Sequence, residues 1–185
     1  MSSGVPVLGV RHVGVPRSHR EPELRLGRGQ GPIEPGRPAV ASCRPYPLER
    51  VLSALRPLMP SLVPEEGAVL LEEHVSPARE CVCGIYAYNG LGPRFRDTYF
   101  CVYLGWGRVY HGRFYWRAQY VRPLALGKLG RPERFDPRGA RAGWIERLAE
   151  RYDIPLLPLR DLGYYVSRFG RWPEEGSGLI PGSAP

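Results

Sequence analysis

The aromatic residues of this 185-residue chain are concentrated in one stretch, which limits the fold more than any other feature. Residues 86–120 hold 12 of the 20 Phe, Tyr and Trp residues. Aromatic and β-branched residues favour strands. From 113 to 121, two sets of side chains alternate with the period of a strand that has one buried face. The pattern predicts an antiparallel hairpin with strands at 99–110 and 113–121 and a turn at His111-Gly112. Gly105 and Gly107 are expected at a bulge or a close approach.

Other segments predict two short helices. Pro47 suits a first helical turn, and leucine and valine follow it at helical spacing, so a helix is expected over 47–56. A second apolar helical face predicts a helix over 142–152. Prolines at 155 and 158 predict an extended segment over 154–158, and residues 162–169 suit either a strand or a helix. The expected class is α+β: a small antiparallel sheet with two short helices packed on it.

The ends of the chain differ in composition from its centre. The first 45 residues contain no Phe, Tyr or Trp and are rich in Gly, Pro and Arg, so they bury too little apolar surface to offset the entropy of ordering them. We expect a flexible or loosely packed segment over 1–45, with one edge strand near Val5–Val10. A single α+β domain is expected over 46–170 and a flexible tail over 171–185.

The chain is basic because of arginine. Its net charge is +8, spread without a basic block, and Lys128 is the only lysine. Asn89 is the only asparagine, and there are 21 prolines. Few amides and many prolines are typical of heat-adapted proteins, and a GC-rich genome gives the same arginine bias, so the expected source is a thermophilic or GC-rich prokaryote, or one of its viruses. No run approaches the roughly 18 apolar residues of a membrane span, and the first residues lack the apolar core of a signal peptide. These features predict a cytoplasmic protein, in which cysteines serve as thiols or metal ligands.

Three blocks of sequence resemble an uncharacterised bacterial and phage protein family. Residues 74–87 read His-x2-Pro-x3-Cys-x-Cys-Gly-Ile-Tyr-Ala, residues 106–124 carry a Trp-Gly-x-Val hairpin, and residues 148–155 end a helix with Tyr-x-Ile-Pro. The similarity covers roughly residues 62–157, and it implies an architecture rather than an activity. In that family a further cysteine often precedes the histidine, whereas residues 69–71 here read Val-Leu-Leu.

The Cys-x-Cys pair has several interpretations. His74, Cys81 and Cys83 lie within ten positions and could hold zinc with His111, Cys43 or Cys101 as a fourth ligand. Thiol catalysis would pair Cys83 with His111 or His74, and a Cys81/Cys83 redox pair is a further alternative. The simplest interpretation is two small side chains packed on one face of a strand. We therefore predict no cofactor, with zinc as the alternative.

The arginines of the aromatic region suit a nucleic-acid surface. Aromatic rings stack on bases, and arginines hold phosphates. Phosphate-binding glycine motifs are absent, and no catalytic residues are predicted. The expected function is that of a non-enzymatic accessory protein that binds nucleic acid or a ribonucleoprotein, and a protein-interaction module is the alternative. The predicted contact residues are Arg94, Arg96, Arg108, Arg113, Arg117, Tyr110 and Tyr115.

Overall fold

The computed structural model describes four long parts of the chain and several shorter ones. The described residues are 6–13, 21–26, 31–43, 75–78, 83–92, 95, 98–129 and 140–173. The expected helix over 47–56 lies outside them, as do residues 174–185 of the expected tail.

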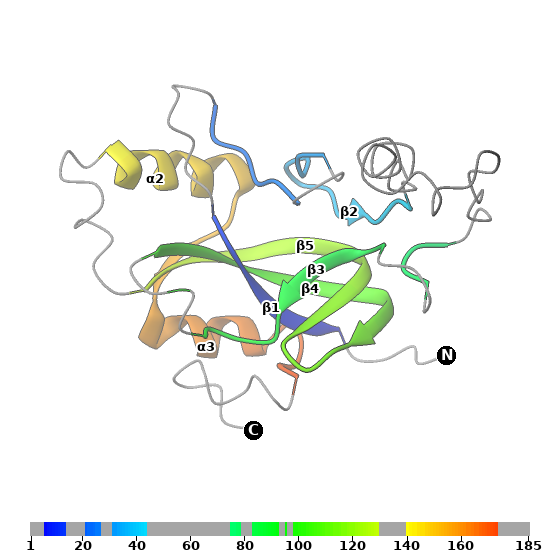
Figure 1. Cartoon of the computed structure of the whole chain (residues 1–185). Coiled ribbons are helices and arrows are strands. Elements are labelled where there is room, and N and C mark those ends of the chain that lie inside the picture. The colour runs from blue at the N-terminus through cyan, green and yellow to red at the C-terminus, as the bar shows by residue number, and fades with distance from the viewer. Residues whose placement is uncertain are drawn as a thin grey trace, which may run out of the picture.

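A mainly antiparallel sheet forms the centre of the molecule, with a helix on each of its faces (Figure 1). In chain order the elements are β1 (Val7–His12), β2 (Ala39–Val40), β3 (Ile85–Tyr88), β4 (Thr98–His111), β5 (Tyr115–Leu129), α2 (Ala140–Tyr152), β6 (Leu156–Pro158) and α3 (Leu159–Ser167). The predicted α+β class, the hairpin and the helix over 142–152 are therefore confirmed. Residues 156–158 are extended as expected, and they pair in parallel with β5. Of the two alternatives for residues 162–169, the helix is correct for most of the segment.

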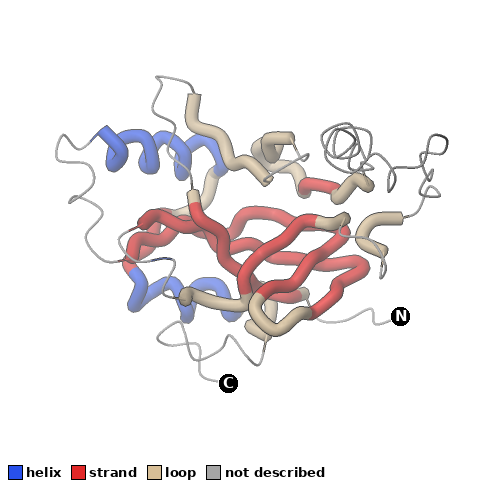
Figure 2. The backbone as a smooth tube through the Cα atoms, in the orientation of Figure 1, coloured by secondary structure: helices blue, strands red, loops and turns tan. Residues whose placement is uncertain are grey.

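The hairpin of β4 and β5 is longer and more curved than its sequence predicts (Figure 2). β5 does not stop at 121 but continues to Leu129, because a register shift opposite Val102 and Tyr103 accommodates Pro123. A second shift between Trp106 and Val109 contains Gly107, whose φ of 79° suits glycine. The predicted bulge is therefore confirmed at this position, and the two irregularities let the strands bend.

The N-terminal strand is central rather than at an edge, so the expected edge strand is wrong. β1 pairs with β4 from Val7↔Gly105 to His12↔Phe100 and meets β3 at Val10↔Tyr88. Because β3 also pairs with β5, and β5 with β4, the four strands form a closed circuit. The described parts of residues 1–45 contribute buried side chains to the core, so a flexible segment is wrong for them. These side chains are aliphatic (Val7, Leu8, Val10, Leu24, Leu26 and Ile33), which is why a count of aromatic residues missed them.

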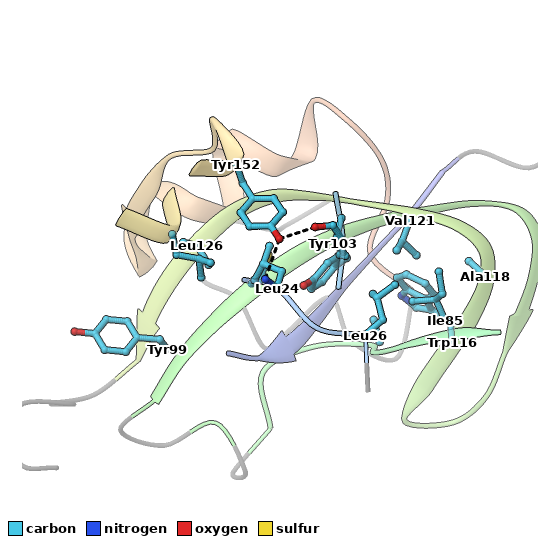
Figure 3. Close-up of a cluster of buried hydrophobic side chains, with 14 of the residues drawn as sticks. Leu24, Leu26, Ile85, Tyr99, Tyr103, Trp116, Ala118, Val121, Leu126 and Tyr152 are labelled. Carbon is cyan, nitrogen blue, oxygen red and sulfur yellow. Dashed lines mark hydrogen bonds between the residues drawn. The ribbon is translucent and has the colours of Figure 1, made fainter. Parts of the chain in front are cut away.

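Trp116 lies inside this circuit and is fully buried (Figure 3). Its indole N–H donates a hydrogen bond to the carbonyl of Leu8 on β1, at 2.8 Å. The ring lies against the backbones of Gly9 and Gly105, and a Cβ built on Gly105 would be 2.6 Å from two of its carbon atoms. Glycine is therefore required at both positions by the close approach of the ring.

Two hydrophobic cores cover the two faces of the sheet. One lies between the sheet and α2 and includes Trp116, Ile145 and Leu148. The other lies between the sheet and α3 and includes Phe100 and Leu162. Alternate residues of β4 enter different cores, so this strand is buried on both faces.

Tyr152, at the end of α2, holds two N-terminal segments against the core that lies between the sheet and α2. Its hydroxyl accepts a hydrogen bond from the N–H of Leu24 (3.0 Å) and donates one to the carbonyl of Ile33 (2.6 Å), as Figure 3 shows. At the other end of the described chain, the N–H of Arg171 donates to the carbonyl of Pro6. Residue 171 therefore belongs to the domain, contrary to the expected start of the tail.

Replacing Gly9 by alanine should destabilise the protein by about 1–3 kcal/mol, because the new methyl group would overlap Trp116 and Ala87. The free energy of unfolding in urea measures this change. Gly92→Ala is the matched control, since a Cβ there meets no atom within 4 Å. Equal effects of the two variants would show that Trp116 does not pack against β1.

Replacing Tyr152 by phenylalanine should cost about 1–3 kcal/mol, because it leaves a buried N–H and a buried carbonyl without their partner. Thermal unfolding followed by circular dichroism reports the loss. Tyr164→Phe, at a side chain that is 74% exposed, should change stability by less than about 0.5 kcal/mol. A neutral Tyr152→Phe variant would contradict the role of this hydroxyl.

Candidate nucleic-acid interface

One face of the sheet, near the β4–β5 turn, carries tyrosines from three strands. Tyr86 of β3 and Tyr110 of β4 are both cross-strand partners of Arg117 on β5, which lies between them. Tyr88 pairs with Tyr115 in the same way. Directly paired residues of antiparallel strands point to the same side, and residues two apart do so as well. Tyr86, Tyr88, Tyr110, Tyr115 and Arg117 therefore share one side of the sheet, which we call the tyrosine face.

Ring contacts hold the tyrosine face together. The guanidinium of Arg117 lies 4.9 Å from the centre of the Tyr110 ring and donates a hydrogen bond to the carbonyl of Cys83, at 3.1 Å. The rings of Tyr86 and Tyr115 are 5.4 Å apart and tilted by 50°. Partial burial raises the pKa of Tyr86, and the charge of Arg117 opposes that shift. The cation–π contact places the charge of Arg117 beside the rings on which a base could stack.

The turn beside the tyrosine face is fixed by Asn89, the asparagine that follows β3. Its side-chain N–H groups donate to the carbonyls of Gly112 (2.9 Å) and Arg113 (3.2 Å), and its backbone N–H donates to the carbonyl of Phe114. The turn nevertheless exposes its side chains. Phe114 is 65% exposed with the guanidinium of Arg113 5.0 Å from its ring centre, and Tyr115 is 46% exposed. An ordered backbone thus presents accessible aromatic and cationic groups.

All the Arg, Lys, Asp and Glu side chains that occur in the hairpin are cationic. Residues 98–129 contain four arginines and one lysine but no aspartate or glutamate. The four ion pairs between described residues involve Arg25, Arg37, Arg151 and Arg160, all of which lie outside the hairpin. A polyanion approaching the hairpin therefore meets no carboxylate on either strand.

A small cavity of about 170 Å³ adjoins the tyrosine face, lined by Arg11, Tyr86, Ala87, Tyr88 and Tyr115. Arg11 of β1 donates a hydrogen bond to the carbonyl of Leu26, at 3.2 Å. Burial lowers the pKa of Arg11, while Tyr103, Cys101 and Tyr88 oppose the shift. A partly buried cation is costly without a charged partner, and Arg11 belongs to none of the four ion pairs between described residues.

The structure brings together only part of the predicted contact set. Tyr110, Tyr115 and Arg117 lie on the tyrosine face, and Arg113 lies in the adjoining turn. Arg108 is also exposed, and its guanidinium donates to the carbonyl of Val75 at 3.3 Å. The remaining two arginines of the prediction, Arg94 and Arg96, lie outside the described residues.

Sequence reasoning missed three members of this site. Tyr86 and Tyr88 come from β3, where their alternation with Ile85 and Ala87 was a usable signal. Arg11 comes from β1, and no local pattern indicated that this strand would reach the site. Tyr103 and Trp116, by contrast, are buried and unavailable to a ligand, although both lie in the aromatic stretch.

The predicted metal ligands are only partly described. His111 lies on β4 and Cys83 precedes β3, and β5 runs between these two strands. Neighbouring strands are about 4.8 Å apart, so β3 and β4 are about 10 Å apart here. His74 and Cys81 lie outside the described residues, and zinc binding stays a prediction. Within the described part of the chain, no three His, Cys, Asp or Glu side chains form a metal-binding group.

Cys83 precedes the strand in which it was expected, and its sulfur accepts a hydrogen bond from the N–H of Ala78.

Comparisons with protein-family models, with curated proteins and with solved structures found no match. The family resemblance therefore stays a prediction. Among the described residues, no helix has the length and apolar character needed to cross a membrane.

In the folded protein, Cys101 should react with iodoacetamide at least about tenfold more slowly than Cys43. Cys101 is fully buried, and burial raises the pKa of its thiol well above the usual value, whereas Cys43 is partly exposed. The thiolate is the reactive form, so little of it is present or accessible at Cys101. Mass spectrometry of peptides after timed labelling measures both rates, which should converge in urea. Rapid labelling of Cys101 in the native protein would contradict its placement in the core.

Proposed function

We propose that this protein is a non-enzymatic accessory protein that binds single-stranded nucleic acid, alone or within a ribonucleoprotein, on the tyrosine face. The observation that carries the proposal is the row of Tyr110, Arg117 and Tyr86 across three paired strands. Rings on an ordered sheet lose little conformational freedom when a base stacks on them. Such stacking contributes about 1–3 kcal/mol per base and tolerates any base. A single strand is favoured because its bases are free to stack, unlike those of a duplex.

The charge distribution supports the same partner. Arg113 lies in the turn beside the tyrosine face, and Arg11 lines the adjoining cavity. Arginines at these two places could hold successive phosphates while the rings between them stack on bases. The absence of carboxylates from residues 98–129 leaves this attraction unopposed within the hairpin.

A protein partner is the second candidate, and the exposed ring of Phe114 favours it. An aromatic side chain that is 65% exposed at the end of a hairpin could insert into a pocket of another protein. The two candidates differ in their response to salt. Binding through phosphate contacts releases counterions, so its affinity falls steeply as the salt concentration rises. The affinity of an apolar contact does not fall in this way.

Fluorescence anisotropy with a labelled 12-nucleotide oligo(dT) at several salt concentrations tests the proposal. Each phosphate contact to a single strand contributes about 0.7 to the slope of log K against log salt. The Arg113→Gln/Arg117→Gln variant should therefore bind more weakly, with a slope reduced by about 0.7 for the phosphate contact of Arg113; the loss of Arg117 removes a stacking partner. Tyr115→Ala should lower affinity by about tenfold with its slope unchanged, because it removes stacking alone.

Arg160→Gln is the matched control for these variants. This arginine is 85% exposed on α3 and pairs with Asp161, so its loss removes one surface charge away from the tyrosine face. The affinity of the Arg160→Gln variant for oligo(dT) should be almost unchanged. Affinity that is independent of salt, or equal losses in the control and the double variant, would refute nucleic-acid binding on this face. Thermal unfolding of each variant distinguishes a lost contact from a lost fold.

A further inference from the structure

A second concave site lies at the outer edge of β5, where that edge is interrupted. β2 pairs with Val121 and Tyr120, and β6 pairs with residues 126–128. Residues 122–124 of β5 lie between these two pairings and pair with neither β2 nor β6. Pro123 lies in the middle of this interval and has no N–H to offer another strand. The interval is therefore unsuited to strand addition and open to a different kind of ligand.

The interruption opens into a cavity of about 410 Å³. Its lining comes from the loop before β2, from both strands of the hairpin, from the end of α2 with the loop that follows, and from α3 with the residues just beyond it. Ligand-binding pockets commonly measure about 300–1,000 Å³, so the cavity is large enough for one small molecule. Tyr152, whose hydroxyl is already bonded to Leu24 and Ile33, contributes to its wall.

Aromatic rings supply much of the lining. Trp106 stacks on Tyr120 with ring centres 5.8 Å apart and an angle of 25°. Tyr165 of α3 and Phe169, just beyond the end of that helix, are in contact, with centres 5.5 Å apart. Trp106, Tyr165 and Phe169 all line the cavity, so rings from a strand and from a helix meet there. This lining suits a planar aromatic group.

The charged groups of the cavity are mainly cationic. Arg122 is exposed, and its guanidinium lies 5.8 Å from the centre of the Phe169 ring. Arg37 pairs with Glu34 at 3.3 Å, but both side chains are more than 70% exposed, and such a pair contributes little. Asp153, at a φ of 50°, is the acidic residue of the lining. Two guanidiniums and one carboxylate favour a ligand that has an anionic group together with hydrogen-bond donors.

We propose that this cavity binds a nucleoside monophosphate. The base lies among Trp106, Tyr165 and Phe169, the phosphate contacts Arg122 and Arg37, and Asp153 accepts hydrogen bonds from the sugar or the base. The site is separate from the tyrosine face, because Trp106 and Arg122 belong to the part of the hairpin away from the turn. The inference therefore does not depend on the proposed function.

Isothermal titration calorimetry with adenosine monophosphate tests this inference. One saturable site per chain is expected, with weaker binding of adenosine, which lacks the phosphate, and of inorganic phosphate, which lacks the ring. Arg122→Gln should weaken binding of the monophosphate by about tenfold or more, since hydrogen bonds to charged groups are strong. It should leave the weaker affinity for adenosine unchanged, because it removes no ring.

Two further variants keep the result interpretable. Arg37→Gln alters a side chain that is 78% exposed and should also weaken binding without affecting the fold. Arg113→Gln, beside the tyrosine face, is the charge-matched control and should bind the monophosphate normally. Three results would each overturn the inference: no saturable heat with the wild-type protein, unchanged affinity in Arg122→Gln, or an equal loss in Arg113→Gln. None of them bears on oligonucleotide binding to the tyrosine face.

Discussion

The contact of Trp116 with the backbones of β1 and β4 determines how the rest of the protein is arranged. A large indole can lie inside the circuit of strands only because Gly9 and Gly105 leave room for it. Its hydrogen bond to Leu8 joins β5 to the N-terminal strand, with which β5 does not pair directly. Since an indole N–H is costly to bury without an acceptor, this bond fixes the orientation of the ring as well as its depth.

The closed circuit explains why aromatic groups remain available near the turn. Along β4 and β5, the helices and the N-terminal segments cover both faces of the sheet, so most large side chains there are buried. Near the turn, β4 extends beyond its pairing with β1 and β5 pairs with β3, and the side opposite Trp116 carries Tyr86, Tyr110 and Tyr115. A single stretch of aromatic sequence thus supplies a buried core on one side and an accessible surface on the other.

Local patterns predicted the hairpin and α2, because the residues that determine them are neighbours in the sequence. β1 was placed incorrectly because nothing near Gly9 indicates that an indole more than a hundred positions later requires that glycine. For the same reason the tyrosine face was found only in part. Its hairpin members follow one alternation, whereas Tyr86 and Tyr88 reach it through the pairing of β3 with β5. Arg11 reaches the adjoining cavity through β1, which pairs with β4. The cavity at Arg122 lies at an interruption in strand pairing; Pro123 marks that interruption locally, but the residues that line the cavity come from distant segments.

The pairing of β1 with β4 also has a consequence for the order of folding. Val7 and its partner Gly105 are 98 positions apart in the sequence. Contacts of such long sequence separation form slowly, because a large loop must close before they give any stabilisation. Until β1 enters, the facing edges of β3 and β4 are uncovered and Leu8 is not available to the indole. Unpaired strand edges promote association between chains, so self-association during synthesis or refolding is the particular hazard of a sheet whose first strand is needed to close it.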